Sequence, residues 1–204
     1  MSQPLDINSI NLPARLLGAF FYYSPESETL IQLQAALNEI ESLFSWRDFQ
    51  QVINQRNIMI DNLTDTELAY QYSVLFEGQG TMTAPPWGSV YLDKENLLMG
   101  ESAARYRQFL AENNIVIQTG INEPEDQFGL MLMALALLIE AEQFTAAKTL
   151  LSEHIMIWAP RYLALLSENE ISPFYRALAA IAESYLSQLV AQLQLTIPFH
   201  YLYK

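Results

Sequence analysis

The run Phe128-Gly129-Leu130-Met131-Leu132-Met133-Ala134-Leu135-Ala136-Leu137-Leu138-Ile139 contains no charged residue and is apolar along its whole length. A helix that is apolar on every side is stable only when other elements surround it. The run is also too short to cross a bilayer, which needs about 20 apolar residues. We therefore predict that it forms the buried central helix of a helical protein, without insertion in a membrane.

The segments around this run have the periodicity of amphipathic helices. A stripe of leucine and phenylalanine predicts a first helix that ends at Ser24-Pro25. The same periodicity predicts further helices at residues 28–44, 47–60, 64–76, 101–113, 144–157, 160–167 and 173–193. We expect the central helix to begin at Pro124, because proline suits a first helical turn. The predicted fold is all-α, a multi-helix bundle with residues 1–204 in a single domain.

The composition favours some partners over others. With 23 acidic and 10 basic residues, the net charge is −13, which disfavours nucleic acid and anionic membranes and favours a cationic partner. Solubility alone could also explain this charge. There is no cysteine and there are only two histidines, so we predict no metal site. The first residues lack the basic start of a secretory signal, and we expect a cytoplasmic protein.

Residues 77–100 interrupt the helical pattern with several glycines and prolines, and predict a long ordered loop between helices. Within it lies the motif Pro85-Pro86-Trp87-Gly88-Ser89-Val90-Tyr91-Leu92-Asp93. Trp87 and Tyr91 are residue types that dominate recognition surfaces. A structural corner with Trp87 in the core is the alternative. The stripe formed by Tyr72, Leu75 and Phe76 just before the loop is either core or the wall of an apolar groove.

A second motif is acidic, Asn122-Glu123-Pro124-Glu125-Asp126-Gln127-Phe128-Gly129. Residues 57–93 and 108–147 hold five and six carboxylates, respectively, and no Lys or Arg. The acids of the motif could simply favour a helix start. Alternatively, Glu123 and Asp126 face one way at the mouth of a groove and bind guanidinium groups. A third possibility is an acid/base pair in a carboxylate-dependent nucleotide hydrolase.

At these two motifs the sequence resembles the TorD/DmsD family of redox-enzyme maturation chaperones. The likeness extends to Ala14-Arg15-Leu16-Leu17-Gly18-Ala19-Phe20-Phe21-Tyr22-Tyr23 and to Pro173-Phe174-Tyr175-Arg176-Ala177-Leu178. It implies an all-helical cytoplasmic chaperone, not an enzyme, that binds the twin-arginine signal peptide of a molybdoenzyme. Such a chaperone delays export until the molybdenum cofactor is loaded. We expect no cofactor in the chaperone itself, while contact with a guanine nucleotide or with molybdopterin stays open.

The resemblance also implies a client and a site. The expected client is a catalytic subunit of the dimethyl sulfoxide reductase type, with trimethylamine N-oxide reductase as the alternative, and components of the twin-arginine translocon are further candidate partners. We expect a monomer and leave a dimer open. The signal-peptide-binding residues implied by matching positions are Tyr72, Leu75, Phe76, Pro86, Trp87, Tyr91, Glu123, Pro124, Asp126 and Gln127. The family pattern usually has histidine where this chain has Gln127, so a role for this residue is limited to hydrogen bonding.

Overall fold

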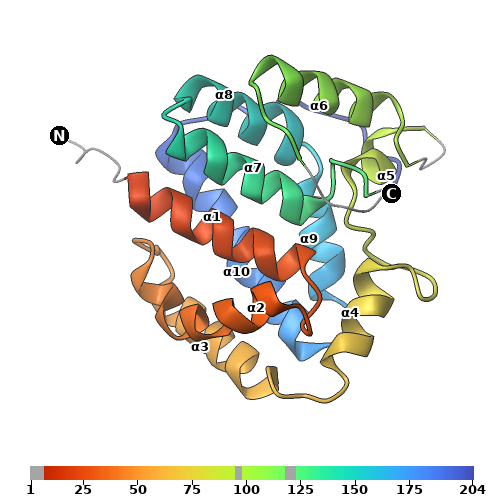
Figure 1. Cartoon of the computed structure of the whole chain (residues 1–204). Coiled ribbons are helices and arrows are strands. Elements are labelled where there is room, and N and C mark those ends of the chain that lie inside the picture. The colour runs from red at the N-terminus through yellow and green to blue at the C-terminus, as the bar shows by residue number, and fades with distance from the viewer. Residues whose placement is uncertain (1–6, 95–97, 118–122) are drawn as a thin grey trace.

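The computed structural model describes residues 7–94, 98–117 and 123–204, and for residues 7–9 the backbone alone. These ranges contain α-helices and no β-strand apart from one isolated bridge, which confirms the all-α class (Figure 1). The α-helices are α1 (Ile7–Tyr22), α2 (Glu28–Leu33), α3 (Phe49–Asn62), α4 (Leu68–Phe76), α5 (Gly88–Leu92), α6 (Glu101–Glu112), α7 (Phe128–Glu140), α8 (Phe144–Thr149), α9 (Ala159–Ser167) and α10 (Pro173–Gln192).

The apolar run forms α7, and this helix is central as predicted. Nearly all of its side chains are buried, and its main neighbour is α1, beside which it lies in Figure 1. The two helices cross so closely that a Cβ atom on Gly18 would lie 2.7 Å from the carbonyl oxygen of Gly129. Glycine at both positions therefore permits the contact that sets the C-terminal end of α1 against the N-terminal end of α7.

The longest helix, α10, packs against α1, α3 and α9. It begins where the sequence predicts, because Ser172 accepts a hydrogen bond from the backbone N–H of Tyr175 and Pro173 occupies the first helical turn. Stacked and edge-on aromatic rings fill the interior where α1, α7 and α9 meet. Among them, the ring centroids of Phe21 and Phe128 are 4.8 Å apart. This aromatic packing therefore joins the C-terminal end of α1 to the N-terminal end of α7.

Several predictions for individual elements are wrong. The helix expected at residues 28–44 is α2 followed by a 3₁₀-helix, Gln34–Ser42, where the indole N–H of Trp46 donates to the carbonyl of Ile40. The long loop at residues 77–100 contains the short helix α5. Finally, α7 begins at Phe128 and not at Pro124, because the side chain of Gln127 caps it.

The segment expected as one helix at residues 144–157 is α8 followed by a π-helical turn, Leu150–Ile155. Such turns are frequent at functional sites. This turn places His154 on the wall of a pocket described below. In the described ranges, no helix is both long and apolar enough to cross a membrane.

Candidate binding site where the two motifs meet

The two motifs singled out in the sequence are in direct contact. The backbone N–H of Phe128 donates to the carbonyl of Pro86 over 2.8 Å, and that of Gly88 donates to the carbonyl of Asp126 over 3.1 Å. Between these bonds, Trp87 and Gln127 form the isolated antiparallel bridge. The proline–tryptophan motif and the acidic motif therefore make one structural unit at the start of α7.

Asp126 holds this unit together from the inside. Its Oδ2 atom accepts a 2.6 Å hydrogen bond from the backbone N–H of Ser89, at the start of α5, and only 3% of the residue is exposed. Burial raises the pKa of this carboxyl group, an effect that the hydrogen bonds from Ser89 oppose. Asp126 is thus a buried support for α5, and the expectation that it faces a groove mouth together with Glu123 is wrong.

Gln127 joins α1 to α7 through the two ends of its side-chain amide. Its Oε1 atom accepts from the backbone N–H of Leu130, and its Nε2 donates to the carbonyl of Phe21, both over 3.0 Å. The carbonyl of Phe21 needs this donor, because the residue that would bond to it in a continuing helix is Pro25, which has no N–H. The hydrogen-bonding role expected for Gln127 is therefore structural.

The bridge separates two pockets, because neighbouring residues of paired extended backbone point to opposite sides. Trp87 and Gln127 face the first, which we call the Trp87 pocket, and Gly88 and Asp126 face the second, the His154 pocket. The Trp87 pocket has a volume of about 490 Å³. It is lined by Tyr22, Tyr23, Ser24, Tyr72, Phe76, Glu77, Trp87, Glu123 and Gln127.

Aromatic rings and carboxylates dominate the Trp87 pocket. Among the described residues that line it there is no Lys, Arg or His. The indole N–H of Trp87 donates to Oε1 of Glu123 over 2.7 Å, which fixes this partly buried carboxylate at the wall. Burial raises the pKa of Glu123, the bond from Trp87 opposes the rise, and the charges of Asp126 and Glu77 add to it. The pocket therefore combines apolar walls with concentrated negative charge.

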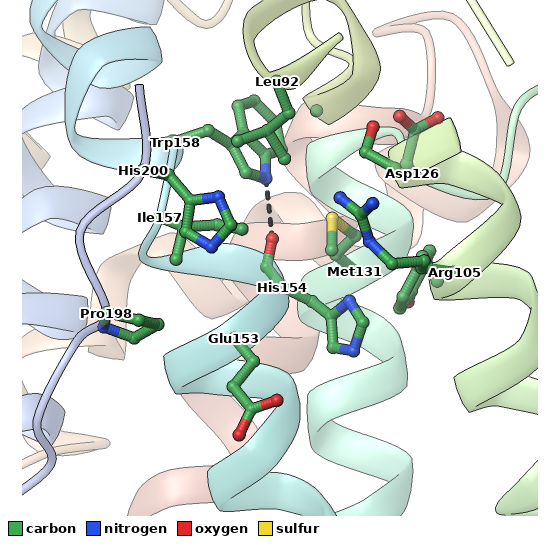
Figure 2. Close-up of a pocket in the computed structure, with 13 residues that line it drawn as sticks. Leu92, Arg105, Asp126, Met131, Glu153, His154, Ile157, Trp158, Pro198 and His200 are labelled. Atoms are coloured by element: carbon green, nitrogen blue, oxygen red, sulfur yellow. Dashed lines mark hydrogen bonds between the residues drawn. The ribbon is translucent and has the colours of Figure 1, made fainter. Parts of the chain in front are cut away.

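The His154 pocket, of about 390 Å³, is mixed in charge (Figure 2). Figure 2 shows Arg105 and Asp126 on one side and His200, from the segment after α10, on the other. Both histidines of the chain thus line one pocket, a convergence that their distance in sequence concealed. Burial and the charge of Arg105 lower the pKa of His154 to about 4, so its imidazole is neutral at neutral pH. The described residues contain no cluster of side chains suited to hold a metal ion.

The acidic motif already binds one guanidinium group. Arg107 of α6 donates from Nε and Nη2 to the two oxygens of Glu125, over 3.1 and 3.2 Å. This forked ion pair lowers the pKa of Glu125 against the opposing effect of burial. The motif therefore has carboxylate geometry that suits arginine, although Glu125 itself is occupied.

The predicted binding residues occupy three different environments. Five line the Trp87 pocket: Tyr72, Phe76, Trp87, Glu123 and Gln127. Asp126 lines the His154 pocket instead. The remaining four are buried and line neither pocket: Leu75, Pro86, Tyr91 and Pro124. Tyr91, for example, stacks on Trp158 with the ring centroids 5.3 Å apart.

Sequence reasoning missed four lining residues of the Trp87 pocket: Tyr22, Tyr23, Ser24 and Glu77. The two tyrosines immediately precede the helix stop at Ser24-Pro25, and an aromatic pair at the end of a helix is a sequence signal for a recognition surface. Glu77 is a single acidic residue at the end of a helical pattern. Nothing in its neighbourhood in the sequence distinguishes it from a solvated side chain.

Comparisons with known proteins agree with the motifs. Residues 31–164 match the family model described as nitrate reductase delta subunit. The Tat proofreading chaperone DmsD of Salmonella typhi is 37% identical over 95% of both chains, and the probable Tat proofreading chaperone DmsD of Haemophilus influenzae is 36% identical over 94% of this chain and 95% of its own. The chaperone protein TorD of Aliivibrio salmonicida is 34% identical over 59% of this chain and 61% of its own. The chain therefore belongs to the TorD/DmsD family of redox-enzyme maturation chaperones.

Proposed function

We propose that this protein is a cytoplasmic chaperone that binds the twin-arginine signal peptide of a molybdoenzyme. It holds back export of the catalytic subunit until the cofactor is loaded and folding is complete. The observation that carries the proposal is the Trp87 pocket, in which the two motifs shared with the family bring aromatic walls and carboxylates together without a basic residue among the described lining.

The chemistry of a twin-arginine leader complements this pocket. The leader presents two adjacent guanidinium groups followed by an apolar run. Aromatic rings such as Tyr72, Phe76 and Trp87 can bury apolar side chains, which contributes about 25 cal/mol per Å² before the cost of ordering the peptide. The carboxylate of Glu123 attracts the guanidinium groups and favours one register of the peptide. Apolar burial supplies most of the affinity, and charge supplies most of the discrimination.

The proposed client is a catalytic subunit of the dimethyl sulfoxide reductase type. In support, the relatives named DmsD match almost the whole chain, whereas the relative named TorD matches little more than half of it. Titrating the purified chain with the leaders of a dimethyl sulfoxide reductase and a trimethylamine N-oxide reductase tests this choice. We expect the former to bind more tightly, and a tighter complex with the latter would reverse the assignment.

A binding protein fits the geometry better than a hydrolase does. The hydrolase hypothesis needs two carboxylates that act on one substrate as acid and base. Glu123 and Asp126, the pair considered for that role, lie in different pockets on opposite sides of the bridge. One arm of the titration therefore includes nucleotide triphosphates, for which we expect no turnover.

A further inference from the structure

The acidic motif offers fewer free carboxylates than its sequence suggests. Glu125 is occupied by Arg107, and Asp126 is buried and bonded to Ser89. Only Glu123 remains to meet an incoming cation, and one partly buried carboxylate gives modest discrimination. A second carboxylate in the same pocket would change this, and the structure places one there from a different part of the chain.

That carboxylate belongs to Glu77, which follows the last residue of α4. The helix ends because Gly78 adopts a left-handed conformation, with φ +75°, and the N–H groups of Glu77 and Gln79 both bond to the carbonyl of Ser73. This turn fixes the backbone of Glu77 at the rim of the Trp87 pocket, next to Phe76 on its wall. The position of Glu77 is thus set by the local fold, while its side chain is exposed.

The end of a helix is an unfavourable place for a carboxylate. The last carbonyl groups of α4 carry partial negative charge, which favours a cation there and disfavours Glu77. Glu77 and Glu123 line the same pocket, and the charge of Glu77 raises the pKa of both Glu123 and Tyr72. Among the described residues, no Lys or Arg forms an ion pair with either glutamate. These negative groups repel one another, and a cation bound among them relieves the repulsion.

The aromatic walls of the pocket that holds the two carboxylates suit a planar cation. Tyr72 and Phe76 stack with ring centroids 5.0 Å apart, and Trp87 lies beside Glu123. A guanidinium group can stack on an aromatic face while its edges donate to carboxylates, which an ammonium group does less well. We infer that one guanidinium group of the leader is held between Glu77 and Glu123, and that Glu77 makes the pocket select arginine over uncharged side chains.

This inference rests on the proposed function and has a separate test. Three synthetic leaders that differ only at the arginine pair, as Arg-Arg, Lys-Lys or Gln-Gln, are titrated against the wild type and Glu77→Gln by fluorescence anisotropy. We expect Glu77→Gln to weaken the Arg-Arg leader about five- to twentyfold, the Lys-Lys leader less, and the Gln-Gln leader not at all. The matched control is Glu67→Gln, which changes the same charge at an exposed residue just before α4, outside the pocket.

The outcomes separate the two claims. If the wild type binds the Arg-Arg leader and Glu77→Gln binds it equally well, the role of Glu77 is refuted while the proposed function stands. An equal loss in Glu67→Gln would assign the effect to net charge and would also refute that role. If the wild type binds none of the leaders, the proposed function itself fails. Circular dichroism of Glu77→Gln checks that the exposed substitution leaves the fold intact.

Discussion

Replacing Gln127 by methionine should destabilise the protein although the volume of the side chain hardly changes. The substitution removes the amide that bonds to the carbonyl of Phe21 and to the N–H of Leu130. Both bonds are buried, and Gln127 is only 3% exposed. Water therefore cannot easily replace either partner, and the end of α1 and the start of α7 each lose a cap.

The size of the effect follows from the two groups left without partners. A buried donor or acceptor without a hydrogen bond costs about 1–3 kcal/mol, and the loss of a helix N-cap costs about 1 kcal/mol. We expect the free energy of unfolding to fall by about 2–4 kcal/mol. In a domain of this size that corresponds to a fall in Tm of about 6–12 °C.

Thermal and urea unfolding followed by circular dichroism measure this loss. The control is Gln79→Met, at an exposed residue whose side chain makes no hydrogen bond within the described part of the chain. Gln127→His should keep both bonds while its imidazole is neutral, and should lose the acceptor as the pH falls below the ordinary histidine pKa of about 6.5. The two hydrogen bonds favour the neutral imidazole, so the pKa of the introduced histidine is lower in the folded protein than in the unfolded chain. The free energy of unfolding of this variant is therefore retained above about pH 6.5 and falls as the pH drops below it. A Gln127→Met protein as stable as the Gln79→Met control would refute the reasoning.

Three further substitutions test other parts of the account. Gly18→Ala should lower the free energy of unfolding by about 1–3 kcal/mol, because the new Cβ meets the backbone of α7. A stabilised variant would show that α1 and α7 do not approach this closely. His154→Asn should flatten the dependence of the free energy of unfolding on pH. Because burial lowers the pKa of His154 to about 4, the wild type keeps the full contribution of the neutral imidazole above pH 6.5 and loses it as the pH falls toward 4. An unchanged pH profile of urea unfolding in the variant would contradict the burial of His154. Trp87→Phe should abolish the change in tryptophan fluorescence on binding of a leader and weaken the complex several-fold, because Glu123 loses its donor. Trp46→Phe, at a tryptophan buried away from the Trp87 pocket, should leave the fluorescence change intact, and loss of the signal in both variants would place the site elsewhere.

Local signals in the sequence explain which elements could be predicted. The continuous apolar run of α7 and the Ser172-Pro173 start of α10 are each visible within a few neighbouring residues. The structure confirms that α7 is buried and that α10 begins at Pro173. The true start of α7 depends on the Gln127 side chain, which caps the helix and also donates a hydrogen bond to the carbonyl of Phe21 in α1. Likewise α5 is a five-residue helix that depends on Asp126, 37 residues after Ser89. Neither dependence is visible in a local pattern.

In the candidate site too, some residues could be predicted from local sequence and others depend on distant contacts. Trp87, Glu123 and Gln127 stand out by residue type and motif, and the structure brings them to one pocket. The bridge between the motifs decides which side each neighbour faces, so Asp126 points away from Glu123 although a helix starting at Pro124 would have aligned them. Glu77 joins the pocket only through the packing of α4, which no spacing in the sequence encodes.

The most direct test of the central claim is a calorimetric titration of the purified protein with a synthetic twin-arginine leader. Two variant leaders accompany it, one with glutamine in place of both arginines and one with serine in place of the leucines of the apolar run. The account predicts saturable binding with one peptide per chain, weakened by the glutamine pair and weakened further by loss of the apolar run. Absence of binding, or equal affinity for a scrambled peptide of the same composition, would contradict it.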